Sequence, residues 1–326
     1  MSQMIELRTV RQARHDPGGL CLFTVVRNEA YFLGHFFEYY RRLGVRNFLV
    51  YDDGSSDGTS DILASQENCS VITSGHAFAD NFGLDVSGMP KRLCTVLRES
   101  VPEHYFRGQW AVSVDADEFI VLPPETDNLP QFISVLESRR QPFAMAPMVD
   151  FYPETLDGRN YPRDLPPFAG NPYFDRGPLF EWPAGNMFPI QFRRGVRYRL
   201  LRRLADTDPD LVAKIYGAHP VSLAKSWKVP LLRHGSGVRR IGDHEISVPP
   251  TSGPAVALAH FKFYPNLDDK IADAIERGQY YNASMEYFFL QAAVARLGSE
   301  NLRGPESVRY DGPTSLMLAG LLPPTA

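Results

Sequence analysis

Three acidic side chains, Asp115, Asp117 and Glu118, lie between two apolar runs in the stretch WAVSVDADEFIVL, residues 110–122. A short apolar run bounded by polar residues is typical of a strand buried on both faces of a parallel α/β sheet. Carboxylates that follow such a strand lie where open α/β sheets bind ligands. Their mutual repulsion is relieved when a hard divalent cation binds between them. The stretch therefore predicts that Asp115 and Asp117 bind a metal ion that holds a phosphorylated substrate; the alternative is a solvated acidic turn.

A second acidic pair, Asp52 and Asp53, follows an apolar run at residues 47–51 and opens the stretch DDGSSDGT. Because the carboxyl ends of parallel strands meet at one edge of a sheet, both acidic pairs are expected on the same edge. A carboxylate there can accept a hydrogen bond from a ribose hydroxyl or a base N–H. The alternative is a surface turn that caps the next helix.

Alternating strands and helices are predicted for the first part of the chain. The apolar patterns indicate strands at residues 20–26, 47–51, 71–73 and 110–114, and helices at residues 30–43, 59–66 and 90–101. This alternation predicts an α/β fold with a parallel sheet built by right-handed crossovers.

The second part of the chain begins with a predicted helix at 129–139 and a strand at 143–152. Residues 153–189 form an irregular insert rich in Pro, Gly and aromatic residues, and the aromatic content argues against disorder. Strands or a hairpin are predicted at 192–204 and 210–216, strands at 228–232 and 256–261, and helices at 267–277 and 283–297. In the insert and beyond it, the aromatic residues available to stack on a sugar or to pack on the sheet are Tyr173, Phe174, Trp182 and Trp227.

Composition excludes several classes of protein. The chain has 326 residues, 44% of them hydrophobic and 22% charged, and its net charge of −4 gives no electrostatic case for binding nucleic acid. Three cysteines without C-x-x-C spacing indicate a reducing compartment. No apolar run approaches the roughly 20 residues of a transmembrane helix, and the first residues lack the apolar core of a signal peptide. A cytoplasmic protein is predicted, and peripheral association with the inner face of a membrane stays open.

The order of motifs resembles a known family. The stretch VVRNEAYFLGHFFEYYRRLGVRNFLVYDDGSSDGT, followed by WAVSVDADEFIVLP, resembles family 2 glycosyltransferases with a GT-A fold. It is most similar to the bacterial subgroup that opens with R-N-E and D-x-S-D-G-T and has the metal motif D-x-D-E-F. The resemblance is good over residues 20–122. It is weaker in the last third, where LLRHGSG, GDHEIS and LAHFKFYP are similar to later motifs of that subgroup.

This resemblance implies sugar transfer from a nucleotide-diphospho sugar, UDP-linked, to an acceptor hydroxyl with Mn²⁺ or Mg²⁺ as cofactor. A glycan or other cell-envelope molecule is the expected acceptor. Transferred by position, Arg27 and Glu29 border the nucleotide, and Asp52 or Asp53 contacts the uracil or ribose. The implied organisation is a lead-in at 1–19, a nucleotide-sugar-binding half at 20–152, an acceptor-side half at 153–305 and a tail at 306–326.

The chemistry of such a transfer needs positive charge at the leaving diphosphate, which a metal ion and nearby cations supply. Lys91 and Arg92, just upstream of the acidic strand, are the main candidates, and Lys262 is a weaker one. The alternative for the first two is a solvated helix face.

A general base must also accept the proton of the acceptor hydroxyl. The candidates for this role are Glu118, Asp150, Asp243 and Glu245. Asp150 ends a predicted strand and is therefore expected near the same edge. Family 2 proteins usually carry an acidic pair after the metal motif; none is evident here, so the base and the stereochemical outcome stay open.

Two histidines in the late motifs, His244 and His260, are candidates to complete the metal shell or to bind phosphate, as GT-A enzymes often do with a late histidine. The alternative for a histidine in an apolar strand such as that of His260 is a hydrogen-bonded place in the core.

Two other functions fit parts of the pattern. A nucleotidyltransferase shares the sheet and the metal but needs a Gly-rich basic loop after the first strand, where this chain has Arg27, Asn28, Glu29 and Ala30. A non-catalytic glycan-binding or scaffolding protein on a degenerate transferase fold is the alternative from another class, and the intact pair Asp115 and Asp117 argues against it.

Overall fold

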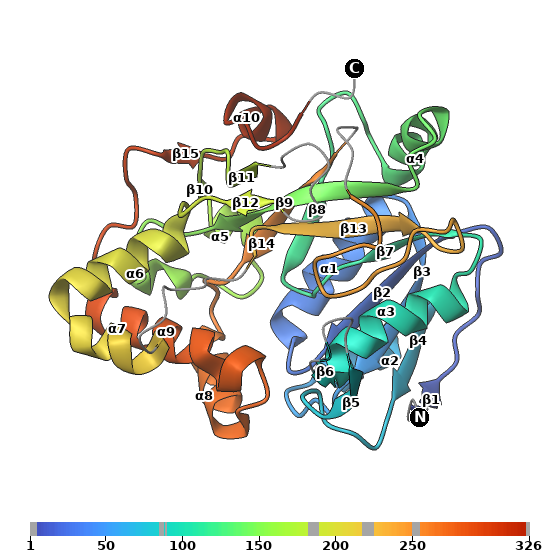
Figure 1. Ribbon diagram of the computed structural model, residues 1–326, viewed down its shortest axis with the longest axis horizontal. Helices are drawn as coiled ribbons and strands as arrows, with labels where there is room; N and C mark the ends of the chain where they lie inside the picture. The colour runs from blue at the N-terminus through green and yellow to red at the C-terminus, as the bar shows by residue number, and fades with distance from the viewer. Residues whose placement is uncertain are drawn as a thin grey trace.

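A nine-stranded sheet runs through the part of the chain that the computed structural model describes, residues 5–84, 88, 90–181, 189–216, 225–249 and 255–323 (Figure 1). The strand order is β1-β4-β3-β2-β7-β13-β9-β14-β8. The strand bounds are β1 Arg8–Arg11, β2 Leu20–Val26, β3 Val45–Asp52, β4 Cys69–Thr73, β7 Trp110–Ser113, β8 Glu118–Val121, β9 Phe143–Phe151, β13 Trp227–Arg233 and β14 Ala257–Phe261.

The direction of the strands decides which ends meet. Strands β4, β3, β2 and β7 are parallel to one another, and so are β9 and β14. Strand β13 is antiparallel to both β7 and β9, so β9 and β14 run in the same direction as β2. Strands β1 and β8 are antiparallel additions at the two edges. The sheet is therefore mostly parallel, and the ends of β2, β3, β7, β9 and β14 open on one edge.

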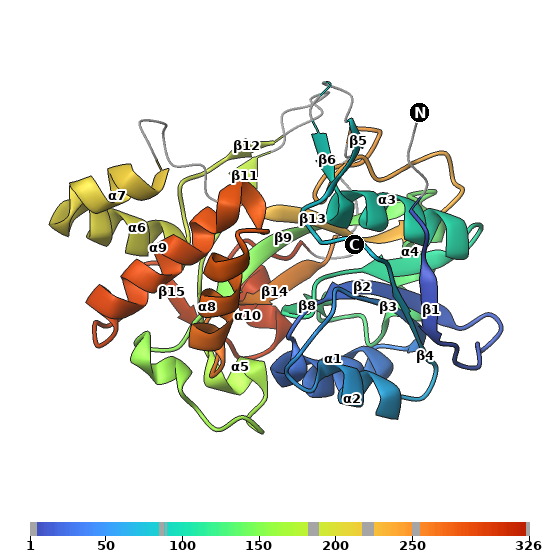
Figure 2. The same cartoon turned by 90° about the horizontal axis from the view of Figure 1, so that it is seen from below.

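Helices cover both faces of this sheet because successive side chains of a strand point to opposite sides. In β2, Leu22 packs in the cluster of α1 (Ala30–Arg42), α2 (Thr59–Ser65) and α4 (Leu129–Ser138), whereas Phe23 packs in the cluster of α3 (Leu93–Tyr105). Figure 2 shows α1 and α2 on one side of the strands and α3 on the other. Residues 90–92, predicted as helix, instead form β6 (Pro90–Arg92), which pairs with β5 (Asn81–Leu84).

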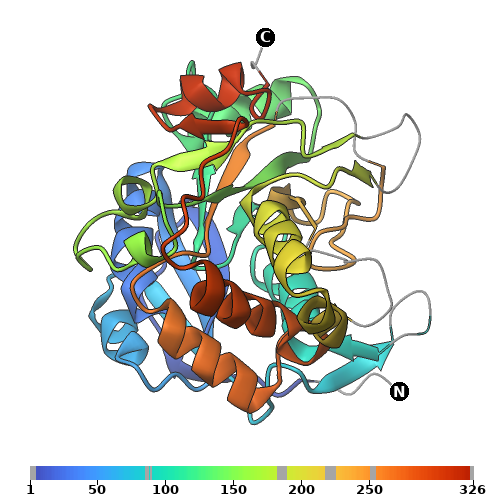
Figure 3. The ribbon, with the colours of Figure 1, turned by 90° about the vertical axis from the view of Figure 1, so that its left-hand side faces the viewer.

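Four helices pack together beside the other half of the sheet: α6 Val196–Thr207, α7 Pro209–Tyr216, α8 Leu267–Arg277 and α9 Tyr281–Leu297 (Figure 3). The prediction of strands or a hairpin at 192–204 and 210–216 is wrong. Val196, Leu200 and Leu204 are buried four residues apart, which is helical spacing. The side chain of Asp208 accepts a hydrogen bond from the N–H of Leu211 (2.9 Å) at the start of α7.

The aromatic insert packs onto the sheet through short elements. These are η1 Asp157–Arg159, α5 Pro167–Gly170, β10 Tyr173–Asp175 and β11 Phe180–Glu181, which pairs with β12 Ile190–Gln191. Strand β10 pairs with β15 (Ser307–Arg309), and the chain continues into α10 (Pro313–Leu318). The Phe168 ring contacts those of Phe151, Phe261 and Tyr310. Trp182 lies outside the described residues.

Within the described part of the chain, no helix combines the length and the apolar character needed to cross a membrane.

We expect Phe119→Ala to lower the free energy of unfolding by about 3–5 kcal/mol, as for other buried phenylalanines. The buried Phe119 ring contacts Phe36, Tyr39 and Phe261, so its removal leaves a cavity where α1 meets β8 and β14. Urea unfolding measures the change, and Phe288→Ala, at a side chain that is 41% exposed, is the control. Equal losses in the two variants would contradict this account of the core.

Candidate functional site

Cross-strand pairing places three predicted site residues in one row. His260 of β14 is the register partner of Glu118 in β8 on one side and of Asp150 in β9 on the other. Asp117 lies beside this row because its carbonyl accepts a hydrogen bond from the N–H of Phe261 (3.0 Å). These residues are far apart in sequence and meet only because β14 inserts between β8 and β9.

His260 is held by the carboxylate of Asp150. Its Nδ1 lies 2.6 Å from Asp150 Oδ1, and its Nε2 lies 3.6 Å from Asp117 Oδ2. Burial opposes ionisation of Asp150, but the Arg197 guanidinium and His260 outweigh it and hold the pKa of Asp150 well below its usual range. The ionised Asp150 carboxylate accepts a hydrogen bond from the Nδ1–H of His260, so Nε2 is the ring nitrogen that faces Asp117.

Among the residues that the structure describes, Asp117, Glu118 and His260 form a group that could hold a metal ion. Each offers one ligand atom, and these atoms all lie within 4.8 Å of one another. The predicted pair was Asp115 and Asp117, but Asp115 is not a member of this group. Its N–H donates to Glu118 Oε2 (2.9 Å), and its carboxylate turns to two cations instead.

Three cationic side chains compensate these acids. Arg98 lies 2.6 Å from Asp115, and Lys228 lies 2.7 Å from Asp115 and 2.6 Å from Glu118. Lys262 lies 2.9 Å from Asp117. Burial alone would raise the pKa of Asp115, but Arg98 and Lys228 hold it well below its usual range. Burial raises the pKa of Glu118, since its side chain is only 1% exposed.

Arg98 and Lys228 were not predicted for this site. Arg98 reaches it from α3, which packs on the face of the sheet opposite α1 and α2. Lys228 comes from the stretch WKVPLL, and its side chain is only 7% exposed. A lysine within an otherwise apolar strand was the available signal, because a buried ammonium needs an acidic partner.

The residues predicted to border the nucleotide are covered by α8. Arg27 and Asp53 also meet directly, since Arg27 Nη1 donates to the carbonyl of Asp53 (2.9 Å). Three ion pairs join this region to α8: Arg27–Asp273 (3.1 Å), Glu29–Lys270 (2.5 Å) and Asp53–Arg277 (3.1 Å). The sequence signal for the α8 partners was their spacing of three and four residues, which places them on one face of the predicted helix.

Asp52 serves the turn that follows β3. Its Oδ1 accepts hydrogen bonds from the N–H (3.0 Å) and hydroxyl (2.7 Å) of Ser55, and its Oδ2 accepts one from the hydroxyl of Ser60 (3.1 Å). Farther along the turn, Asp57 accepts from the N–H of Ala30 (3.1 Å), and Thr59 Oγ1 accepts from the N–H of Glu29 (2.9 Å). The stretch DDGSSDGT thus holds the loop after β2 in place.

Lys91 and Arg92 do not join the acidic group. Lys91 forms an ion pair with Glu99 (2.6 Å), whereas Arg92 lies 3.8 Å from Asp243. Asp243 also lies 3.6 Å from Arg98, so this guanidinium links it to Asp115.

His244 and Glu245 also lie apart from the possible metal ligands of the described residues. His244 Nδ1 is 2.6 Å from the carbonyl of Trp227, and Glu245 forms an ion pair with Lys225. His244 is thus hydrogen-bonded to the backbone, as expected of a structural histidine.

Two further charged residues extend the row. Arg197 Nε lies 2.7 Å from Asp150, and its Nη1 lies 2.5 Å from Glu286 of α9. Neither was predicted for the site: Arg197 falls in a segment predicted as strand, and Glu286 lies in the predicted helix at 283–297. The Glu286 side chain is 34% exposed, so this carboxylate is open to solvent beside the buried row.

Comparison with known proteins gives one partial similarity. No family model matches the chain. A stretch of 55 residues, 17% of the chain, is 33% identical to a glycosyltransferase family 92 protein of Oryza sativa subsp. japonica. This stretch covers 9% of that protein, so the similarity concerns a small part of each chain.

We expect the stability of the wild type to fall more steeply than that of His244→Asn as the pH drops from about 6.5 toward 3. Burial, and secondly Lys228, lower the pKa of His244 to about 3 from the 6.5 of a free histidine. Between these pH values the unfolded chain is protonated at this histidine and the folded protein is not. The free energy of unfolding of the wild type therefore falls by up to about 1.4 kcal/mol more per pH unit than that of the variant.

Urea unfolding at a series of pH values measures this difference. Asparagine can still donate to the Trp227 carbonyl, and His15→Asn, at an exposed histidine, is the matched control. If the free energies of unfolding of the wild type and His244→Asn changed in parallel with pH, the lowered pKa of His244 would be contradicted.

Proposed function

We propose that this protein is a metal-dependent glycosyltransferase of the GT-A type. It transfers a sugar from a nucleotide-diphospho sugar, UDP-linked, to a hydroxyl of a glycan or other cell-envelope acceptor. The observation that carries the proposal is the convergence of Asp117, Glu118 and His260, flanked by Lys228 and Lys262, near the edge where the parallel strands end. The partial similarity to a glycosyltransferase supports the same class.

The donor set of Asp117, Glu118 and His260 fits a divalent ion. The two carboxylates suit Mn²⁺ and Mg²⁺ alike, and the imidazole favours Mn²⁺ because Mg²⁺ prefers oxygen ligands. When bound, such an ion stabilises negative charge on the leaving diphosphate. Asp150 orients the imidazole, and Arg197 in turn holds Asp150.

The cations of the site have a second use in this proposal. Lys228 and Lys262 are held near the acids before any substrate binds, so their ammonium groups are pre-oriented. Fixed charges of this kind stabilise developing negative charge without reorganisation at the moment of reaction. Asp117, Glu118 and His260 would hold the metal ion, and Lys228 and Lys262 would add positive charge beside the diphosphate.

The general base is best sought outside the row. Asp150 is bound by Arg197 and His260, and Glu118 is buried, so neither is free to reach an acceptor hydroxyl. Asp243 and Glu245 are bound to cations elsewhere. Glu286 of α9 is also paired with Arg197 (2.5 Å), but its side chain is 34% exposed, so it is the carboxylate that we propose for this role.

A second candidate is a non-catalytic glycan-binding protein on a transferase-like fold. It is favoured by one observation: Asp115, Asp117 and Glu118 are all paired with cationic side chains of the protein itself. A metal would have to displace Lys262 and Lys228 from these acids, so metal binding decides between the two functions.

We expect UDP with Mn²⁺ to raise the melting temperature of the wild type by several degrees and that of Asp117→Asn far less. A ligand that binds only the folded state stabilises it by about 2.7 kcal/mol at one hundred times Kd. A thermal-shift panel of UDP, GDP and CDP, with and without Mn²⁺, measures this, and Asp164→Asn, at an exposed acid, is the control. No shift with any nucleotide would favour the glycan-binding function.

We expect Asp150→Asn to weaken Mn²⁺ binding by roughly 10- to 100-fold, as for other residues that orient a metal-bound histidine. The asparagine cannot hold the imidazole as an ionised carboxylate does, but it keeps the size of the side chain. Calorimetric titration with Mn²⁺ measures the affinity, again with Asp164→Asn beside it. Unchanged affinity would show that His260 is not a ligand.

A further inference from the structure

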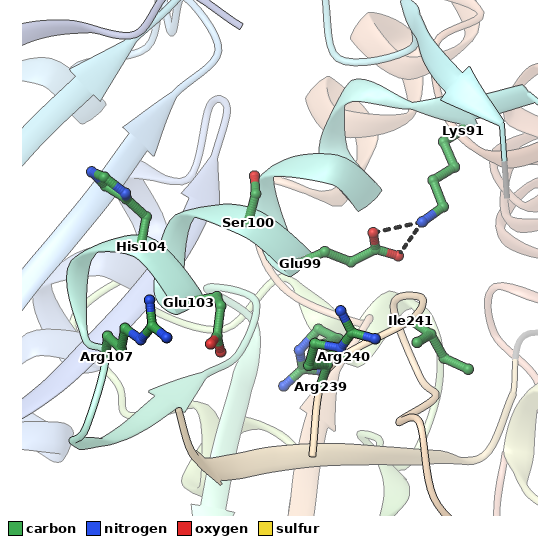
Figure 4. A pocket seen from close by; sticks show the side chains of 9 residues that line it. All are labelled: Lys91, Glu99, Ser100, Glu103, His104, Arg107, Arg239, Arg240 and Ile241. Carbon is green, nitrogen blue, oxygen red and sulfur yellow. Dashed lines mark hydrogen bonds and ion pairs between the residues drawn. The ribbon is translucent and has the colours of Figure 1, made fainter. Parts of the chain in front are cut away.

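A cavity of about 550 Å³ opens between α3 and the chain that follows β13. Figure 4 shows its lining, to which α3 and the residues around it contribute Lys91, Glu99, Glu103 and Arg107. From the other side come Arg239 and Arg240. Asp117, Glu118 and His260 are not part of this lining, so the cavity is separate from the proposed metal site.

The cavity carries more positive than negative charge. Its permanent cations are Lys91 and three arginines, against the carboxylates of Glu99 and Glu103. Glu99 forms an ion pair with Lys91 (2.6 Å), and Glu103 lies 3.1 Å from Nδ1 of the buried His234. Within the described ranges, neither Arg107 nor Arg239 forms an ion pair with a carboxylate. Two guanidinium groups at the surface of the cavity are therefore available to an anion.

Arg240 adds a buried cation that lacks a carboxylate partner among the described residues. Its side chain is only 6% exposed, and its guanidinium binds two backbone carbonyls, those of Val229 (2.6 Å) and Asp243 (3.5 Å). Its Nε is buried without a hydrogen-bond partner. Burial lowers the pKa of Arg240 to about 10, as expected of an incompletely compensated charge. Buried charges are normally paired, and an unsatisfied buried donor calls for an explanation.

We propose that this cavity binds a phosphate monoester group, with Arg240 at its base and Arg107 and Arg239 at its opening. The guanidinium group matches phosphate oxygens with paired N–H donors, and several such groups suit a dianion better than a single carboxylate. The phosphate can belong to a soluble molecule or to a lipid headgroup such as phosphatidic acid. The proposal rests on this cavity alone and does not depend on the transferase function.

The site predicts a specific loss of phosphate binding. In calorimetric titrations of the full-length protein with inorganic phosphate at constant ionic strength, the double variant Arg107→Gln/Arg239→Gln should bind roughly tenfold more weakly or worse, because it loses charge-assisted hydrogen bonds. Both side chains are exposed, so the variant should fold. The control Arg14→Gln/Arg46→Gln removes the same charge at two exposed arginines that do not line the cavity.

Arg240→Lys provides a second variant at the base of the cavity. Flotation with phosphatidylcholine vesicles, with and without phosphatidic acid, distinguishes a lipid headgroup from a soluble phosphate compound. Phosphate binding that only the cavity variants weaken, without flotation on vesicles that contain phosphatidic acid, supports the site and indicates a soluble ligand. Flotation that needs phosphatidic acid and both cavity arginines supports it and indicates a lipid headgroup. The proposal is overturned if wild type binds neither probe, or if the cavity variants and the control bind alike.

Discussion

Compensation of buried negative charge is the constraint on which the rest of this structure depends. Asp115 and Glu118 lie at the turn between β7 and β8, and both are bound by Lys228, whose side chain is itself buried in β13. Taking carboxylates out of water is unfavourable unless opposite charges and hydrogen bonds replace the lost hydration. Glu118, whose side chain is only 1% exposed, can therefore stay inside the protein because β13 places Lys228 beside it. The order of the strands therefore determines which cation compensates the acidic residues of the site.

A second set of charges ties the C-terminal helices to the first strands. Lys270, Asp273 and Arg277 lie along one side of α8 and bind the loops that follow β2 and β3. Burial raises the pKa of Glu29 to about 7 in spite of Lys270, so this junction is sensitive to protonation near neutral pH. On its other side, α8 packs in the main hydrophobic core through Leu267, Ile271 and Ala274. The proposed nucleotide site and the packing of α8 are consequently linked.

The row of Glu118, His260 and Asp150 explains how a flexible chain can hold such a site accurately. Each residue belongs to a different strand, and the ladder hydrogen bonds of β8, β14 and β9 set their spacing. Arg197 adds support from α6 through Asp150. Sites on paired strands with such outer support are held more rigidly than sites on loops.

The sequence by itself determined the alternation of the first strands and helices, because apolar periodicity and local turn chemistry are properties of neighbouring residues. It also pointed to Asp117, Glu118, Asp150 and His260 one by one, as polar residues within or just after apolar strands. Only the tertiary structure decided that these four meet, that Asp115 turns away to Arg98 and Lys228, and that α8 covers the residues predicted for the nucleotide. The physical reason is that these features depend on contacts between residues far apart in the chain. Strand order, strand register and the packing of helices on one another cannot be predicted from local sequence patterns.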